Sequence, residues 1–186
     1  DDIAGIHLNR STIEDIVPHQ PDLIITAQYS NSQLLHFLKH LELPVIEAPL
    51  AWQLGEVAPS FLAFGKLLDQ EARAQSIIDA MYARQHAIIA PLENKRRPKA
   101  LILAPGGFTH GKNTLKGDLL ELAHFENVAA SHGIDGHAYV DLETILAMQP
   151  EFLLLEDETR NRHSLQQQFL QHPALRQGLP HTQLID

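Results

Sequence analysis

The chain has 186 residues, 44% of them hydrophobic and 20% charged, which is ordinary for a folded protein with a sizeable core. Its formal net charge is −9 without any stripe of Lys or Arg, so nucleic acid and anionic membranes are unfavourable partners. Cysteine is absent, which excludes disulfides, thiolate metal sites and cysteine nucleophiles, and no apolar run reaches the roughly 18 residues of a membrane span.

The first part of the chain alternates helices with short apolar strands. In order, we expect a helix capped by Ser11 or Thr12, a strand at Leu23–Thr26, a polar loop at Ala27–Ser32, a helix at Gln33–Leu41, a strand at Leu43–Glu47, a loop at Ala48–Leu54 and a helix at Gly55–Leu68. This alternation indicates an α/β lobe with a parallel-type sheet.

A long helix is predicted from Asp69 to about Leu92. Apolar residues recur there at helical steps, and neither Gly nor Pro interrupts the pattern before Pro91. We expect Asp69 to cap its first turn. At 1.5 Å per residue the helix spans roughly 30–36 Å, about the width of a small domain.

The rest of the chain alternates in the same way. We expect a buried strand at Lys99–Ala104, a glycine-rich loop at Pro105–Asn113, a helix at Thr114–His124 capped by Asn113 or Thr114, a turn at Gly133–Gly136, a short strand at Tyr139-Val140, a helix capped by Asp141, a strand at Phe152–Leu155, a helix at Arg162–Gln171 and a last strand at Thr182–Ile185.

Two stretches on either side of the long helix resemble each other. Thr12–Thr26 matches the stretch from Leu142 to Glu156 at a constant offset, with Gln-Pro followed by an acidic residue and an apolar strand in both. We therefore predict an α/β fold of two similar Rossmann-like lobes joined by one long helix, truncated at both ends. Residues 1–68 form the N-terminal lobe, 69–93 the linking helix and 94–186 the C-terminal lobe.

Ligands of α/β sheets bind beyond the carboxyl ends of the strands. The loops expected there carry a set of aromatic and polar residues: Tyr29, Trp52, Phe108, Thr109, His110 and His137. Any one of them is most simply a loop residue packed on its own lobe. Together they suit a bulky ligand held by stacking and a few hydrogen bonds, so we predict that this set binds the ligand.

Two alternatives arise from other features of the sequence. Gly106–Lys112 matches the G-x-x-x-x-G-K pattern of a phosphate-binding loop, although Asn113 stands where Ser or Thr is required, so a nucleotide- or phosphate-binding enzyme is one alternative. The other alternative is a zinc- or manganese-binding protein, because the chain has twelve histidines, but their spacing identifies no metal ligand. No pairing of a nucleophile with a base is evident.

The sequence resembles the substrate-binding proteins of ABC importers for iron–siderophore, haem and cobalamin. The resemblance is carried by the two helix–Pro–acid–strand units, by the linking helix and by the run from Phe108 to Ala129. It implies that the ligand lies between the lobes and that Glu14 and Glu143 dock with arginines of the membrane permease. Ala27 and His137 stand where cobalamin binders of this family carry aromatic residues, which weakens cobalamin as the ligand.

The resemblance thus implies a non-enzymatic binding protein, periplasmic or lipid-anchored outside the cell, without a cofactor of its own. It would capture a metal chelate and deliver it to an ABC permease in the inner membrane. A ferric siderophore is the favoured cargo, with haem or cobalamin as alternatives, and we expect a monomer. A single connecting helix further implies little hinge motion.

Overall fold

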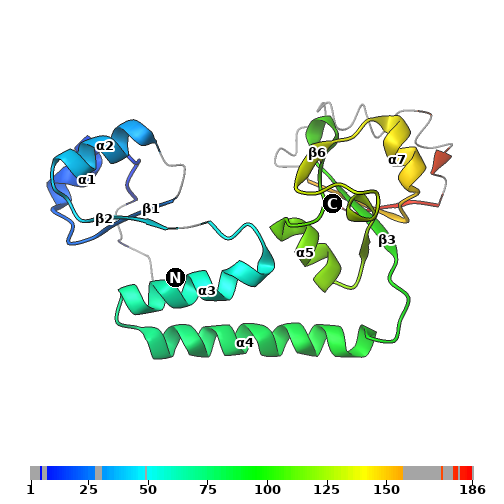
Figure 1. The fold of residues 1–186 in the computed structure, drawn as a ribbon, viewed down its shortest axis with the longest axis horizontal. Coiled ribbons are helices and arrows are strands. Elements are labelled where there is room, and N and C mark those ends of the chain that lie inside the picture. Colours follow the sequence, from blue (N-terminus) through cyan, green and yellow to red (C-terminus); the bar gives the residue numbers. More distant parts are fainter. Residues whose placement is uncertain are drawn as a thin grey trace. The chain divides into compact units, whose positions relative to one another are not determined.

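The computed structural model (Figure 1) describes residues 5, 8–27, 31–48, 50–156, 173, 178–179 and 181–185. It divides into two compact units, Asp1–Leu50 and Ala51–Asp186. The predicted N-terminal lobe extended to residue 68, whereas the helix that ends there and the long helix after it both belong to the second unit. The predicted helix at Arg162–Gln171 lies outside the described residues.

The first unit is a small parallel α/β element. Its elements are α1 (Ile13–Ile16), the 3-10 turn η1 (Val17–His19), β1 (Ile24–Ala27), α2 (Ser32–His40) and β2 (Val45–Ala48). The two strands pair in parallel, with Ile25 opposite Ile46. Asn31 begins α2, because its side-chain oxygen accepts hydrogen bonds from the amides of Gln33 (2.9 Å) and Leu34 (3.3 Å).

The second unit holds two helices that precede a larger α/β fold. In chain order its elements are α3 (Leu54–Leu67), α4 (Glu71–Ile89), η2 (Ala90–Leu92), β3 (Lys99–Leu103), η3 (Pro105–Gly107), β4 (Phe108–His110), α5 (Leu115–Leu122), β5 (Glu126–Asn127), α6 (Val128–Ser131), β6 (His137–Tyr139), α7 (Leu142–Met148), β7 (Phe152–Leu155) and β8 (Gln183–Ile185).

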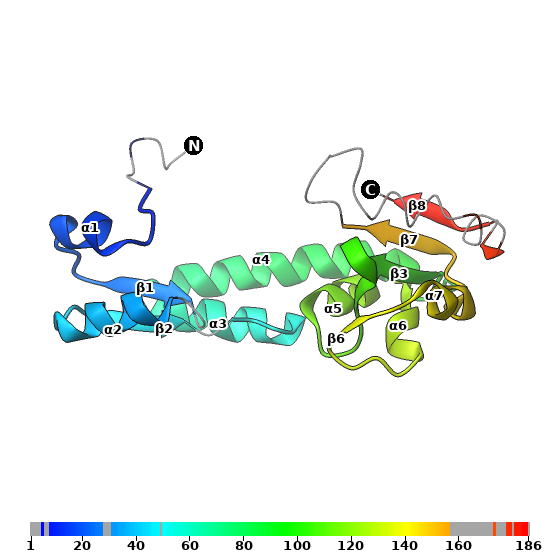
Figure 2. The ribbon, with the colours of Figure 1, turned by 90° about the horizontal axis from the view of Figure 1, so that it is seen from above.

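A four-stranded parallel sheet in the order β5-β3-β7-β8 forms the centre of this unit, with β3, β7 and β8 side by side in Figure 2. On one face, Leu101 and Leu103 of β3 pack with residues of α6 and α7. On the other face, Ala100 and Ile102 pack with Leu120 of α5. Helices therefore cover both faces of the sheet, and the mixed α/β fold that the sequence predicts is confirmed.

The connection between α3 and α4 corrects the predicted start of the long helix. Asp69 does not cap α4: its φ of 53° places it in the left-handed region, and Gln70 occupies the N-cap position. The turn is closed by hydrogen bonds from the Gln70 amide to Gly65 O (2.7 Å) and from the Asp69 amide to Lys66 O (3.2 Å). A Cβ on Gly65 would collide with Ala74, so this glycine lets α3 and α4 pack closely.

The two repeat units share a backbone feature at matched positions. Gln20 follows the first repeat helix with φ 45° and ψ 57°, and Gln149 follows the second with φ 49° and ψ 55°. Both residues are left-handed and both precede a proline, which cannot continue a helix. The repeat seen in the sequence is therefore a repeat in structure at these residues. Asp141 caps α7 as predicted, accepting the Thr144 amide at 2.8 Å.

An ion pair fixes the point where the chain from α4 enters the sheet. The two Arg96 Nη atoms donate to the two Glu151 carboxylate oxygens at 2.7 and 2.6 Å, and the Lys99 amide donates to Glu151 Oε1 at 3.0 Å. These hydrogen bonds, led by the one from Arg96, lower the pKa of Glu151 to about 2. The acidic residue of the second repeat thus anchors the end of the α4–β3 connection.

Candidate functional site

A short antiparallel strand pair stands beyond the carboxyl end of β3, where ligands of such sheets bind. It joins β4 to β6 and pairs Phe108 with Tyr139 and His110 with His137. The sequence predicted a loop in place of β4 and a strand at Tyr139-Val140, so both predictions are wrong in detail. We call the pair, with its aromatic side chains, the β4–β6 platform.

The aromatic rings of the platform contact one another. Phe108 stacks on His137 with ring centroids 5.4 Å apart and an angle of 11° between the planes. Tyr139 meets Phe108 edge-on at 5.2 Å, and His110 meets His137 edge-on at 5.0 Å. His137 is exposed and Tyr139 is 76% exposed. The structure therefore brings three of the predicted ligand residues together, with His110 only 5% exposed, and adds Tyr139, which sequence reasoning missed.

Buried polar side chains hold β4 in place. Asn127 is 1% exposed; its Nδ2 donates to His110 O at 2.9 Å, and its Oδ1 accepts from the amides of Ala129 and Ala130 at the start of α6. Thr109, a predicted ligand residue, is fully buried, and its hydroxyl donates to Ile102 O at 2.7 Å. Thr109 therefore serves as framework, with its side chain turned away from any ligand on the surface.

A charged group borders the platform. Glu156, directly after β7, lies with Oε1 3.3 Å from His110 Nε2 and with Oε2 2.7 Å from Lys116 Nζ. Burial lowers the pKa of His110, and the nearby Lys116 and His137 lower it further, whereas Glu156 raises it. Sequence reasoning missed Glu156, although its position at the end of a strand in the second repeat was a usable signal.

The glycine-rich loop does not have the structure of a phosphate-binding loop. Such a loop directs several backbone N–H groups at one anion. Here the amide of Gly107 donates to Ala104 O (3.2 Å), that of Gly111 to Gly136 O (2.9 Å) and that of Lys112 to Ile134 O (3.0 Å). Three amides of the loop are thus already bonded to carbonyl groups, which weakens the structural basis of the enzyme alternative.

Of the two remaining predicted ligand residues, Trp52 lies within the described chain and Tyr29 does not. Trp52 is 48% exposed and precedes α3, whose start is tied to α5 by a 2.8 Å hydrogen bond from the Leu54 amide to Asp118. Tyr29 lies outside the described residues. Their part in binding stays a prediction.

The two predicted docking glutamates occupy equivalent places in the repeats. Glu14 lies in the first turn of α1 and Glu143 in the first turn of α7, where the helix dipole favours a carboxylate. Both are exposed, and neither forms an ion pair with another described residue. Their carboxylates are therefore available to a partner, and docking itself stays a prediction.

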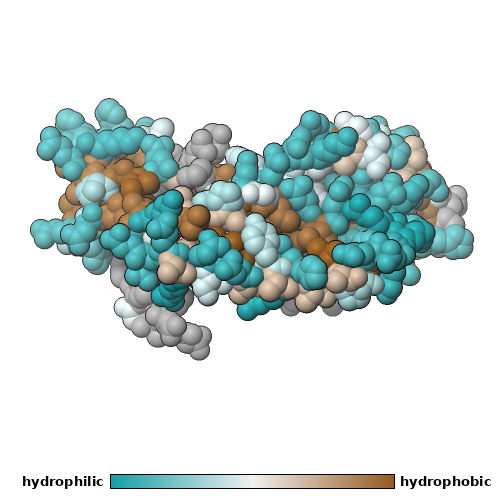
Figure 3. All heavy atoms as spheres, turned by 60° about the horizontal axis from the view of Figure 1, so that its bottom comes forward, coloured by the Kyte–Doolittle hydropathy of each residue, from teal (hydrophilic) through white to brown (hydrophobic). Residues whose placement is uncertain are grey.

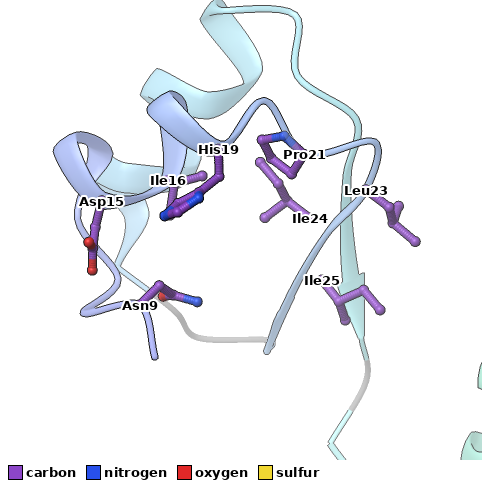
Figure 4. A pocket seen from close by; sticks show the side chains of 8 residues that line it. All are labelled: Asn9, Asp15, Ile16, His19, Pro21, Leu23, Ile24 and Ile25. Carbon is purple, nitrogen blue, oxygen red and sulfur yellow. The ribbon is translucent and has the colours of Figure 1, made fainter. Parts of the chain in front are cut away.

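The described residues line a hollow in each unit that the sequence did not predict. In the first, a hollow of about 360 Å³ is polar at Asn9, Asp15 and His19 and apolar along β1 (Figure 4). In the second, an apolar groove of about 390 Å³ runs between α3 and α4 and includes Phe61, Ile77 and Ile88. Figure 3 shows hydrophobic side chains on the face that carries these helices.

In the described part of the chain, no three His, Asp or Glu side chains are arranged to hold a metal ion. No helix within the same residues combines the length and the hydropathy that crossing a membrane requires.

Comparison with known sequences gives a match over most of the chain. The sequence model of the periplasmic binding protein family matches residues 7–178. The molybdate-binding protein MolA of Haemophilus influenzae is 20% identical over 172 residues, 81% of this chain and 49% of that protein. A cobalamin-binding protein of Halobacterium salinarum is 23% identical over 155 residues, 82% of this chain and 42% of that protein. The chain thus spans less than half the length of these relatives.

Solved structures share the fold. A possible iron-binding periplasmic solute-binding protein from Staphylococcus epidermidis has a TM-score of 0.71 at 23% identity, covering 83% of this chain and 60% of that one. A periplasmic haem-binding protein from Pseudomonas aeruginosa has a TM-score of 0.68 at 20% identity, covering 91% of this chain and 62% of that one.

Proposed function

Because the chain belongs to the periplasmic binding protein family, we propose that it captures a metal chelate outside the cytoplasm and delivers it to the permease of an ABC importer. The location is the periplasm, or the outer side of the cell membrane if a lipid anchors the protein. The bound group is cargo, and no enzymatic step is proposed. Among relatives of this fold are proteins described as binding haem, cobalamin and molybdate.

The observation that carries the choice of cargo is the β4–β6 platform. Its stacked Phe108 and His137 and the exposed ring of Tyr139 offer aromatic surface to a bulky, partly apolar molecule. A bare metal ion would need three or more protein ligands, and no such group occurs among the residues that the structure describes. A metal ion already coordinated by an organic chelator fits both the aromatic surface and the lack of such a ligand group. A ferric siderophore is the favoured chelate, with haem or cobalamin as alternatives.

The partner is proposed to be the importer's permease, contacted through Glu14 and Glu143. Two exposed carboxylates in equivalent places of two repeats suit a partner that presents two basic sites, and charge complementarity speeds and orients such encounters. We propose that the protein works as a monomer.

Equilibrium titration of the protein's tryptophan and tyrosine fluorescence tests the cargo. The panel is a ferric hydroxamate, a ferric catecholate, haemin, cobalamin, molybdate and zinc. We expect tight, stoichiometric quenching by one chelate, and weaker binding in Phe108→Ala and His137→Ala. His86→Ala, an exposed position on α4, is the matched control and should bind as the wild type does. Binding of molybdate or zinc alone, unaffected by both platform variants, would refute the proposal.

A further inference from the structure

The imidazole of His110 is buried within the second unit. The residue is 5% exposed, and neither ring nitrogen makes a hydrogen bond of good geometry within the described chain, although Nε2 lies 3.3 Å from Glu156 Oε1. Both nitrogens are themselves buried, so no ligand atom reaches them in this arrangement. A buried polar atom without a partner is rare in folded proteins and calls for a reason. The Glu156 carboxylate lies 3.3 Å from Nε2 and its side chain is 23% exposed, so it offers a route by which a proton from water can reach this ring.

Among the described residues, charged and titratable groups face His110 from the end of β7, from α5 and from β6. Glu156 follows β7 and lies 3.3 Å from Nε2, Lys116 of α5 holds the other Glu156 oxygen at 2.7 Å, and His137 of β6 has its ring centre 5.0 Å away. With His110 uncharged, Glu156 and Lys116 form a balanced pair. Protonation of His110 would place a second positive charge beside the Glu156 carboxylate. The charged ring would then be close enough to Lys116 for the two cations to repel each other.

We propose that His110 is an acid-operated switch, whose uncharged ring keeps the β4–β6 platform in place and whose protonation loosens it. The ring of His110 lies edge-on to both members of the stack, at 5.3 Å from Phe108 and 5.0 Å from His137. A charged ring is driven toward water, because burying it is costly, and it can leave only by disturbing that stack. The platform would then bind its cargo less tightly at acid pH, a consequence that rests on the proposed function.

The direction of the pH effect follows from the environment of the ring. Burial holds the pKa of His110 below its usual value of 6.5, so the folded platform favours the uncharged ring. The stability that this residue contributes is therefore complete above pH 6.5. It decreases as the pH falls below 6.5 and through the lower pKa of the folded state.

Nuclear magnetic resonance tests the switch without any cargo. We expect the His110 Cε1–H signal to titrate below pH 6.5, the usual value for histidine. The amides of Gly111 and Val140, which are hydrogen-bonded at the two ends of the platform, should lose protection from hydrogen exchange in the same pH range. A normal titration of His110, or unchanged protection of both amides across it, would overturn the proposal.

Two variants assign the effect to His110. In His110→Gln, which cannot be protonated, the loss of amide protection at acid pH should disappear, whereas His86→Gln should retain it. If His110→Gln does not fold, the wild-type titration still decides. Binding of haemin and of a ferric hydroxamate, measured at neutral and acid pH, then separates the two proposals. If amide protection depends on pH but neither probe binds, the switch is supported and the proposed cargo is contradicted.

Discussion

Asn127 lets the stability of the platform's framework be tested quantitatively. Its side chain performs two separate tasks while 1% exposed: Oδ1 caps α6, and Nδ2 donates to the carbonyl of His110. Replacing Asn127 by Ala removes both. Loss of an N-cap costs about 1 kcal/mol, and leaving a buried acceptor without its donor costs about 1–3 kcal/mol. We therefore expect Asn127→Ala to lower the free energy of unfolding by about 2–4 kcal/mol.

A second substitution at the same position separates the two tasks. Serine caps helices about as well as asparagine, but its hydroxyl is too short to replace the bond from Nδ2 to the His110 carbonyl. Asn127→Ser should therefore be more stable than Asn127→Ala by about 1 kcal/mol. Gln75→Ala, an exposed change on α4, is the control and should stay within about 0.5 kcal/mol of wild type.

Urea unfolding followed by circular dichroism measures these differences. The comparison should use the midpoint and slope together, because a changed slope would indicate a changed unfolded state. A value for Asn127→Ala within about 0.5 kcal/mol of wild type would refute the reasoning, since it would mean that neither the cap nor the bond to β4 contributes. Equal stability of the Ala and Ser variants would refute the division between the two tasks.

Three further predictions follow from the same structure. The thermal stability gained from Glu151 should be complete above pH 4.5 and be lost as the pH falls toward 2, so Glu151→Gln should flatten melting temperature against pH in that range. Gly111→Ala should lower the free energy of unfolding by about 1–3 kcal/mol, because a Cβ would strike the Ile134 carbonyl. Gly55→Ala, in open space on a helix, should raise the free energy of unfolding slightly, and urea unfolding measures both changes. The pair Glu14→Ala and Glu143→Ala should abolish cargo transport in cells and leave cargo affinity unchanged.

Controls make each of these outcomes interpretable. Glu93 is exposed, so Glu93→Gln should keep the acid dependence that Glu151→Gln loses. The exposed pair Glu42→Ala and Glu93→Ala removes the same charge as the docking pair and should leave transport intact. An unchanged acid profile in Glu151→Gln contradicts the role of its ion pair. A large loss of affinity in the docking pair contradicts the assignment to the permease.

The strands of the parallel sheet could be predicted because each is a short, continuous apolar run bounded by a turn signal. Phe152–Leu155 was found with its observed bounds, since Pro150 and Glu151 mark its start and four apolar residues follow. The repeat added independent support, and Gln20 and Gln149 share one left-handed backbone conformation. The local sequence pattern was sufficient here, because a strand that is buried on both faces appears in the sequence as a continuous apolar run.

The start of α4 could not be predicted from the same kind of pattern. Asp69 is a favourable cap by residue type, and nothing nearby in the sequence excludes it. In the structure Asp69 instead ends α3: it is left-handed, and the amides of Asp69 and Gln70 donate to the carbonyls of Lys66 and Gly65. The close approach of Gly65 to Ala74 fits the two helices together, and the residue type of Asp69 alone does not distinguish the end of one helix from the start of the next.

The candidate site shows the same limit. The sequence predicts that Phe108, His110 and His137 are loop residues that share a ligand, yet they meet through a strand pair whose partners are separated along the chain by α5 and α6. Close backbone packing makes this pairing fit, since the carbonyls of Val140 and Ile134 occupy the space that a side chain on Gly107 or Gly111 would need. Gly111, which belongs to the phosphate-loop pattern in the sequence, is therefore required for a different purpose. Together with Gly107 it lets the segment that carries β6 approach closely enough to build the aromatic platform, so packing at this glycine supports the binding alternative.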